Sequence, residues 1–118
     1  MGQLTTHVLD IATGVPAAGV RIDVHEDRVS GEPVPLARAV TSLDGRVAAP
    51  LLVGTALRAG HYTLTFHLAE YFRGRGVALP QPAFIERAVI QIGIADPEQH
   101  YHVPLLITPW SYSVYRGG

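Results

Sequence analysis

Hydrophobic and polar residues alternate in short runs along most of this chain. Six runs show the alternation clearly, at residues 5–10, 20–27, 61–68, 88–94, 100–107 and 111–116, and shorter ones lie near 36–41 and 51–53. A period of two is typical of β-strands with one buried face. Nine prolines and twelve glycines separate the runs. The pattern therefore predicts about eight strands joined by turns, which favours a β-sandwich.

Only one segment has helical spacing. Leu68, Tyr71 and Phe72 recur at positions i, i+3 and i+4, and Gly74 and Gly76 would end the helix. This predicts a helix of about two turns over 68–74, which needs tertiary packing to persist. The chain contains no linker, repeat or low-complexity tract. We expect residues 1–118 to form one domain.

Composition and charge exclude several classes of protein. With 118 residues, 47% hydrophobic and 16% charged, the chain can bury a core and is not disordered. No apolar run approaches the roughly 20 residues of a transmembrane helix, so we expect no membrane partner. The net charge is -1, and the nine basic residues are scattered arginines, which argues against nucleic acid as a partner.

The cysteine count and the N-terminus bear on the compartment. The chain has no cysteine, which excludes a disulfide framework, a thiolate zinc site and a cysteine nucleophile. That absence fits a reducing compartment. The N-terminus lacks the basic and apolar regions of a secretory signal. We therefore expect a cytoplasmic protein.

Six histidines stand out, because imidazole titrates near neutral pH and is the commonest general acid or base. Three occupy polar strand faces and are interpreted as surface residues: His25, His61 and His67. His7 and His102 instead lie on faces that are partly apolar. The residues on the opposite face of 100–107 are apolar and are predicted to lie in the core, namely Tyr101, Val103, Leu105 and Ile107. The pattern alone leaves a catalytic and a structural role open for His7 and His102.

The same histidines could also form a zinc site. His100 and His102 would share one face of a strand, and His7 could supply a third ligand. However, the sequence has no HExxH motif and no dense acidic–histidine cluster. It also has no phosphate-binding glycine loop and no GxSxG nucleophile elbow. We therefore expect no metal.

Several segments together resemble the 5-hydroxyisourate hydrolases, the transthyretin-related branch of the transthyretin superfamily. The similarity covers the opening at 5–10 and 14–20, an Asp-Gly-Arg turn within 41–46, Tyr71-Phe72, and a closing signature at 100–106, 108–109 and 112–117. These matches run in order along nearly the whole chain. The resemblance implies an all-β fold, a transthyretin-like β-sandwich of two four-stranded sheets with one short helix. It also implies a homotetramer, a dimer of dimers with active sites at the dimer–dimer interface.

The implied activity is hydrolysis of 5-hydroxyisourate to 2-oxo-4-hydroxy-4-carboxy-5-ureidoimidazoline in urate catabolism. The resemblance assigns catalysis to His7, Arg46 and His102. One histidine, with His7 preferred, would take a proton from water, and the other would orient water or protonate the leaving nitrogen. Arg46 would bind the substrate and stabilise developing negative charge. A site that does both needs no metal or cofactor.

The same resemblance implies a set of substrate-binding residues and leaves open an alternative function. The binding residues would be Tyr115, Arg116 and Gly118; Gly118 stands where these hydrolases commonly end in Ser. Transthyretin carries Lys, Glu and two Thr at the positions of His7, Arg46, His102 and Tyr115. The alternative is a non-catalytic protein that binds a small ligand on the same scaffold. A structural module would leave the polar residues of one strand face unexplained.

Strand alternation also suggests where such a site would lie. If the strands that contain His7, His102 and Tyr115 share a sheet, these side chains share one half-apolar face. A partly apolar outward face on a small domain suggests a contact between subunits.

Overall fold

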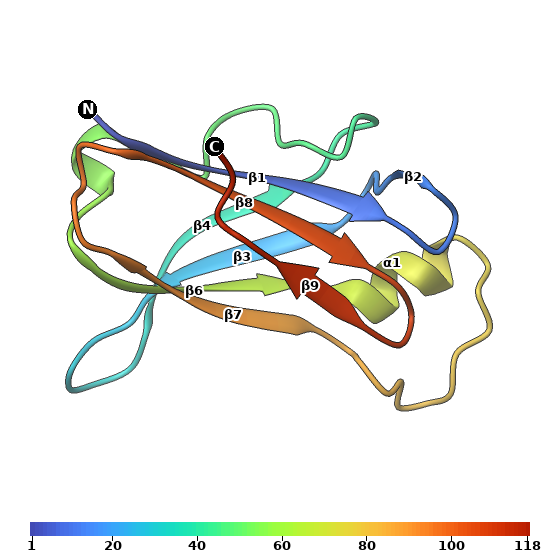
Figure 1. Ribbon diagram of the computed structural model, residues 1–118. Coiled ribbons are helices and arrows are strands. Elements are labelled where there is room, and N and C mark those ends of the chain that lie inside the picture. The colour runs from blue at the N-terminus through green and yellow to red at the C-terminus, as the bar shows by residue number, and fades with distance from the viewer.

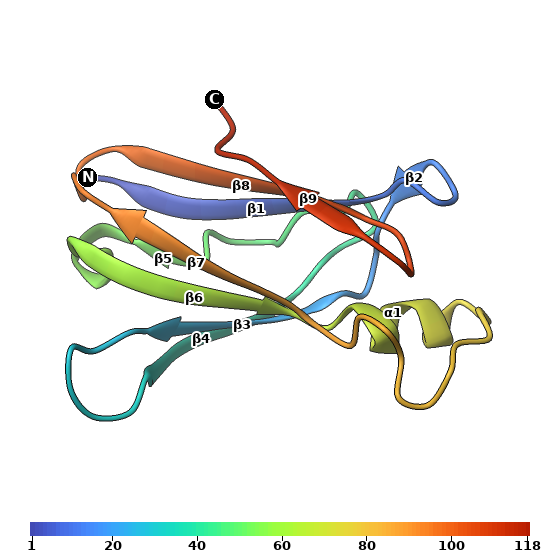
Figure 2. The same ribbon diagram turned by 60° about the horizontal axis from the view of Figure 1, so that its bottom comes forward.

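The computed structural model describes residues 1–118 and shows two β-sheets packed face to face (Figures 1 and 2). The first sheet contains β1 (Gln3–Asp10), β2 (Val15–Pro16), β5 (Leu52–Val53), β8 (His100–Ile107) and β9 (Tyr112–Val114). The second contains β3 (Arg21–Glu26), β4 (Val34–Val40), β6 (Gly60–Phe66) and β7 (Ala88–Ile94). A 3₁₀ turn spans Gly54–Ala56, and helix α1 (Leu68–Gly74) lies at one end of the sandwich.

The predicted β-sandwich is confirmed, and α1, β7 and β8 have the predicted bounds. The last strand is shorter than predicted, because Ser111 belongs to the hairpin turn, where its carbonyl accepts the Thr108 N–H at 2.9 Å. The two-residue β2 was not predicted, since so short a run has no alternation to detect. It and β5 both pair with β1, so the first sheet has five strands.

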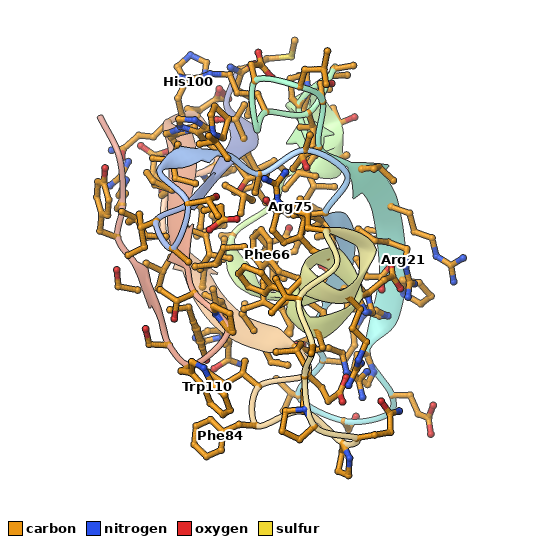
Figure 3. The ribbon with its side chains drawn as sticks, turned by 90° about the vertical axis from the view of Figure 1, so that its right-hand side faces the viewer. Arg21, Phe66, Arg75, Phe84, His100 and Trp110 are labelled. Carbon is orange, nitrogen blue, oxygen red and sulfur yellow. The ribbon has the colours of Figure 1, made fainter.

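The core lies between the two sheets and is built by the alternation. Along β8 the predicted core residues Tyr101, Val103, Leu105 and Ile107 are all buried. They pack in one cluster of 21 buried residues with side chains from both sheets, including Phe66, which lies between the layers in Figure 3. Because successive strand residues face opposite ways, the intervening residues of β8 point outward.

β1 and β8 are the one parallel pair, and every other strand pairing is antiparallel. Thr5 lies opposite His102 and His7 lies opposite Pro104. The inward residues of β1 include Leu4 and Val8, both fully buried. The register therefore places His7 and His102 on the same outer face of the first sheet.

A buried carboxylate at the end of β1 holds the helix to the first sheet. Asp10 is 1% exposed. Its Oδ1 accepts the N–H groups of Ala12 and Thr13, and its Oδ2 accepts the Tyr71 hydroxyl at 2.9 Å. Burial, together with this bond, raises the pKa of Tyr71 to about 12. The short helix α1 is thus tied to the strand that carries His7.

No helix of the fold has the length and apolar character that crossing a membrane requires.

We predict that Tyr71→Phe lowers the free energy of unfolding by about 1–3 kcal/mol, because the buried Asp10 carboxylate loses a donor. Urea unfolding followed by circular dichroism measures the change. Tyr112→Phe is the control, since the Tyr112 side chain is exposed and its hydroxyl has no protein partner. Equal stability of the two variants would contradict the anchoring role of Asp10.

Candidate active site

One row of residues crosses the outer face of the first sheet. His7 pairs with Pro104 on one side and with Arg46 through an isolated bridge on the other. The Tyr115 N–H donates to the Pro104 carbonyl at 3.4 Å, which extends the row beyond β9. The backbone therefore brings Tyr115, His7 and Arg46 together from three distant parts of the sequence.

A second row runs beside the first. His102 pairs with Thr5 on β1 and forms an isolated bridge with Gly117, whose N–H donates to the His102 carbonyl at 2.7 Å. The rings of His7 and His102 lie nearly parallel, with their centroids 6.3 Å apart and their planes at 30°. Both imidazoles are half-buried, so each retains a face that is accessible to solvent.

The turn before Arg46 is built to lie against β1. Gly45 has φ +80°, a conformation that favours glycine, and its carbonyl accepts the Val8 N–H at 2.9 Å. A Cβ at Gly45 would collide with the Val8 carbonyl. The Asp44 carboxylate accepts the Arg46 N–H at 3.0 Å. The guanidinium of Arg46 is exposed and makes no ion pair.

Both histidines are held in their neutral form. Burial is the larger cause that lowers the pKa of His7, and the Arg46 charge lowers it further against a smaller opposing effect of Asp44. Burial also lowers the pKa of His102, with further contributions from Arg46 and His7. Because both pKa values lie below the ordinary 6.5, the neutral form of each ring predominates at pH 7.

A groove beside His102 offers space for a small molecule. Its volume is ≈ 600 Å³, and its lining includes Thr5, Arg46, His100, His102 and Gly118. Gly117 lies so close to the ring that an added Cβ would be 2.7 Å from His102 Cδ2. The predicted site residues His7, Arg46, His102, Tyr115 and Gly118 thus gather around one face of the sheet.

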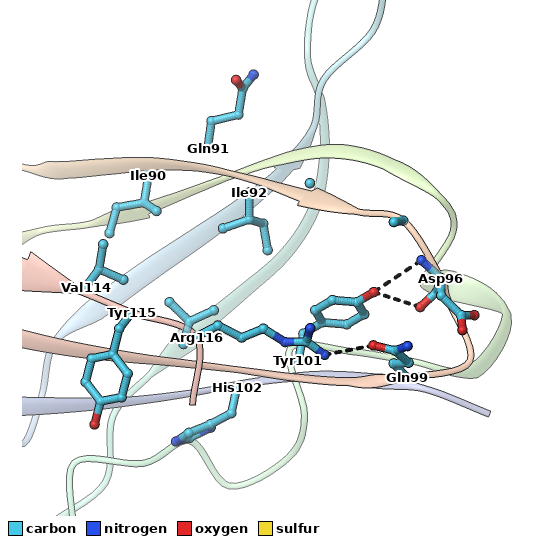
Figure 4. Close-up of a pocket in the computed structure, with 13 residues that line it drawn as sticks. Ile90, Gln91, Ile92, Asp96, Gln99, Tyr101, His102, Val114, Tyr115 and Arg116 are labelled. Atoms are coloured by element: carbon cyan, nitrogen blue, oxygen red, sulfur yellow. Dashed lines mark hydrogen bonds between the residues drawn. The ribbon is translucent and has the colours of Figure 1, made fainter. Parts of the chain in front are cut away.

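Arg116 does not line this groove. Figure 4 shows its side chain directed toward Tyr101, with the guanidinium carbon 4.3 Å from the ring centroid. It donates to Gln99 Oε1 at 3.0 Å and to the His100 carbonyl at 3.2 Å. It lines a second, mostly apolar pocket of ≈ 450 Å³ near β7, together with His102 and Tyr115. Arg116 therefore lies near His102 without lining the groove, and it anchors the segment that carries Tyr115 and Gly117.

Strand parity could have indicated this placement, because consecutive residues of an extended segment face opposite sides. With Tyr115 facing outward, Arg116 has to face the other way. Thr5 was also missed by sequence reasoning, although its hydroxyl lies 2.8 Å from His102 Nδ1. No local signal predicts that contact, since it depends on the register of two strands that are far apart in the sequence.

The second sheet carries a different histidine cluster. His67, interpreted from the sequence as a surface residue, has a side chain only 13% exposed, and its Nε2 lies 2.7 Å from Asp23 Oδ2. Burial of Asp23 favours a higher pKa, but the His67 hydrogen bond and the charges of His67, Arg21 and Arg38 leave the pKa of Asp23 lowered. His67 is thus a structural partner of a carboxylate.

No three His, Cys, Asp or Glu side chains group closely enough to hold a metal ion. His100, which the zinc interpretation would pair with His102, is exposed and projects from the surface in Figure 3.

Fold and site together define a transthyretin-like β-sandwich with a histidine–arginine site on the outer face of one sheet. A model of the HIUase/Transthyretin family matches residues 4–117. The chain belongs to this family.

Individual relatives agree with the family assignment. The chain is 52% identical to "5-hydroxyisourate hydrolase 2" of Rhizobium meliloti, covering 98% of this chain and 96% of that protein. The structure of Klebsiella pneumoniae 5-hydroxyisourate hydrolase matches with TM-score 0.82 and 36% identity, over the full length of both chains. A structure of (S)-allantoin synthase matches with TM-score 0.92 and 39% identity; it covers 99% of this chain, which spans 44% of that one.

We predict that Arg46→Gln raises the pKa of both His7 and His102, because a neighbouring cation disfavours the imidazolium. Both imidazoles stay half-buried in the variant, so desolvation still lowers their pKa values. Proton NMR titration of the imidazole Hε1 signals measures both pKa values. Arg38→Gln on the second sheet is the control and should move neither. Unchanged titration in Arg46→Gln would contradict the placement of that guanidinium.

Proposed function

We propose that this chain is a hydrolase that converts 5-hydroxyisourate to 2-oxo-4-hydroxy-4-carboxy-5-ureidoimidazoline in urate catabolism. The observation that carries the proposal is the convergence of His7, His102 and Arg46 on one outward face. Relatives named as 5-hydroxyisourate hydrolases support the proposal, because they are about 50% identical to this chain over nearly its full length. We further propose that residues 1–118 act as one domain and that the protein works in the cytoplasm.

His7 is the general base of the proposed mechanism. Neither of its ring nitrogens has a hydrogen-bond partner in the protein, so one can accept a proton from water. The ring is neutral at pH 7 because burial and Arg46 lower its pKa. A positioned general base of this kind typically contributes about 10²–10⁴-fold to the rate. Water activated by His7 attacks a ring carbonyl of the substrate.

Arg46 and His102 act on the substrate itself. The Arg46 guanidinium, which has no carboxylate partner, binds the oxygen-rich edge of the planar substrate and stabilises the oxyanion that water attack creates. His102 lies beside His7 and donates a hydrogen bond to the leaving ring nitrogen, and the proton that His7 took from water passes to that nitrogen as the C–N bond breaks. Tyr115 and the backbone at Gly118 position the ring. These roles need no metal or cofactor.

We also propose that the protein is a homotetramer, a dimer of dimers with the active sites at the dimer–dimer interface. β7 and β9 end their sheets with no further strand beside them, and such open edges are where a second chain pairs. The outer face around the histidines also carries Leu9 and Leu106, both only half-buried, which gives it apolar surface to cover. A second dimer on that face would exclude water from the groove.

A coupled ultraviolet assay tests the proposed activity. Urate oxidase generates 5-hydroxyisourate in situ. The decay of 5-hydroxyisourate is then followed with and without the purified protein, in the presence of a chelator. We expect accelerated decay that the chelator does not affect. Decay at the spontaneous rate would overturn the proposal and favour a non-catalytic protein that binds a small ligand.

We predict that His7→Ala and His102→Ala each lower kcat by about two decades or more, because each removes an acid or base group. Initial rates in the coupled assay measure the change. His61→Ala, an exposed histidine of the second sheet, is the matched control and should retain wild-type rates. If either active-face variant also retains them, that histidine has no part in the mechanism.

A further inference from the structure

A side-chain hydrogen bond within the site joins His102 to a residue that the mechanism does not use. Thr5 Oγ1 lies 2.8 Å from His102 Nδ1, and the contact is partly shielded from solvent. We propose that Thr5 is a positioning residue whose hydroxyl holds the His102 ring in one orientation and in the tautomer that carries its proton on Nε2. This inference rests on the function proposed above and deepens it.

The His102 ring is held at both edges. Its Nδ1 faces Thr5 on β1. Its Cδ2 faces Gly117, where an added Cβ would lie only 2.7 Å away. A half-turn of the ring about the Cβ–Cγ bond would exchange these atoms and place a carbon against the Thr5 hydroxyl. The hydrogen bond therefore selects one of two ring orientations that would otherwise have similar shapes.

The same bond selects the tautomer. A neutral imidazole has one N–H donor and one acceptor nitrogen, and a hydroxyl can donate one proton. The Thr5 hydroxyl has no protein acceptor other than His102 Nδ1, so donation from Thr5 satisfies both groups. Nδ1 then uses its lone pair, and the ring proton resides on Nε2. If Nδ1 carried the ring proton and donated it to Thr5, the hydroxyl proton of Thr5 would have no protein acceptor.

This tautomer divides the work between the two histidines. His102 Nε2 has no hydrogen-bond partner in the protein, and His102 lines the groove. In this neutral tautomer the Nε2–H can donate a hydrogen bond to the leaving nitrogen of the substrate, but Nε2 cannot accept a proton from water. His7, with both nitrogens free, keeps the role of base. An orienting partner on the second ring nitrogen is a general means of fixing a catalytic histidine.

The neighbouring threonine shows that this role is specific to one face. The hydroxyl of Thr6 donates to the Val103 carbonyl at 2.7 Å inside the core. Thr6 is 1% exposed and supports the pairing of β1 with β8 from within. Thr5 faces the opposite way and reaches only the histidine.

The test compares Thr5→Val, which keeps the branched shape and removes the hydroxyl, with Thr5→Ser, which keeps the hydroxyl. Thr65→Val is the matched control, because Thr65 is a half-buried strand residue whose hydroxyl has no protein partner. Long-range ¹H–¹⁵N correlation spectra of the ¹⁵N-histidine-labelled protein report the tautomer of His102. The coupled assay gives kcat and KM separately.

We expect an Nε2–H tautomer for His102 in the wild type, in Thr5→Ser and in Thr65→Val, and a mixed tautomer in Thr5→Val. We expect kcat to fall about tenfold in Thr5→Val, the effect of one lost hydrogen bond, with KM changed less than twofold. Thr5→Ser should restore kcat to within about threefold of the wild type.

A wild-type tautomer with the proton on Nδ1 would overturn the proposal, as would a Thr5→Val protein with unchanged tautomer and kcat. Equal losses of kcat in Thr5→Val and Thr5→Ser would also overturn it, since the hydroxyl would not be the cause. The spectra need no substrate. A wild-type protein that shows the expected tautomer but no turnover would therefore refute the proposed function and not the positioning by Thr5.

Discussion

The parallel pairing of β1 with β8 is the constraint on which the core and the site both depend. It joins residues 97 positions apart in the sequence and sets Thr5 opposite His102. Because side chains alternate, a shift of one residue in either strand would turn its outward set toward the core. Val8 and Leu105 can be buried only while His7 and His102 face outward. The hydrophobic effect that closes the sandwich therefore also fixes the positions of the two imidazoles.

The sequence predicts where the strands lie better than it predicts which strands pair with one another. β7 and β8 were predicted at their observed bounds, since each is a clean alternation that ends at turn residues. The pairing order, and with it the His102–Thr5 contact, has no local signal. The resemblance to a family supplied the set of His7, Arg46 and His102, but strand parity was needed to see that Arg116 points toward Tyr101 and not into the groove.

The two outer faces of the sandwich use histidine in opposite electrostatic settings. On the second sheet, His67 lies against the Asp23 carboxylate at 2.7 Å and is held in a network of charges. On the first sheet, His7 and His102 have a guanidinium nearby and no carboxylate within hydrogen-bond distance. A carboxylate stabilises imidazolium, whereas a cation and burial disfavour it. On the first sheet, burial and then the Arg46 charge lower the pKa of both imidazoles, which favours unprotonated nitrogens at neutral pH.

The long sequence separation between β1 and β8 also governs when the site forms during synthesis. β1 is made first, and β8 and β9 are the last strands of the fold. Pairings between such distant segments form slowly, because a long loop of chain must close before any contact stabilises it. Until β8 arrives, β1 presents an unpaired edge of the kind that invites aggregation. A nascent chain on the ribosome that lacks β8 can already hold β3, β4, β6 and β7, yet it has no assembled active site.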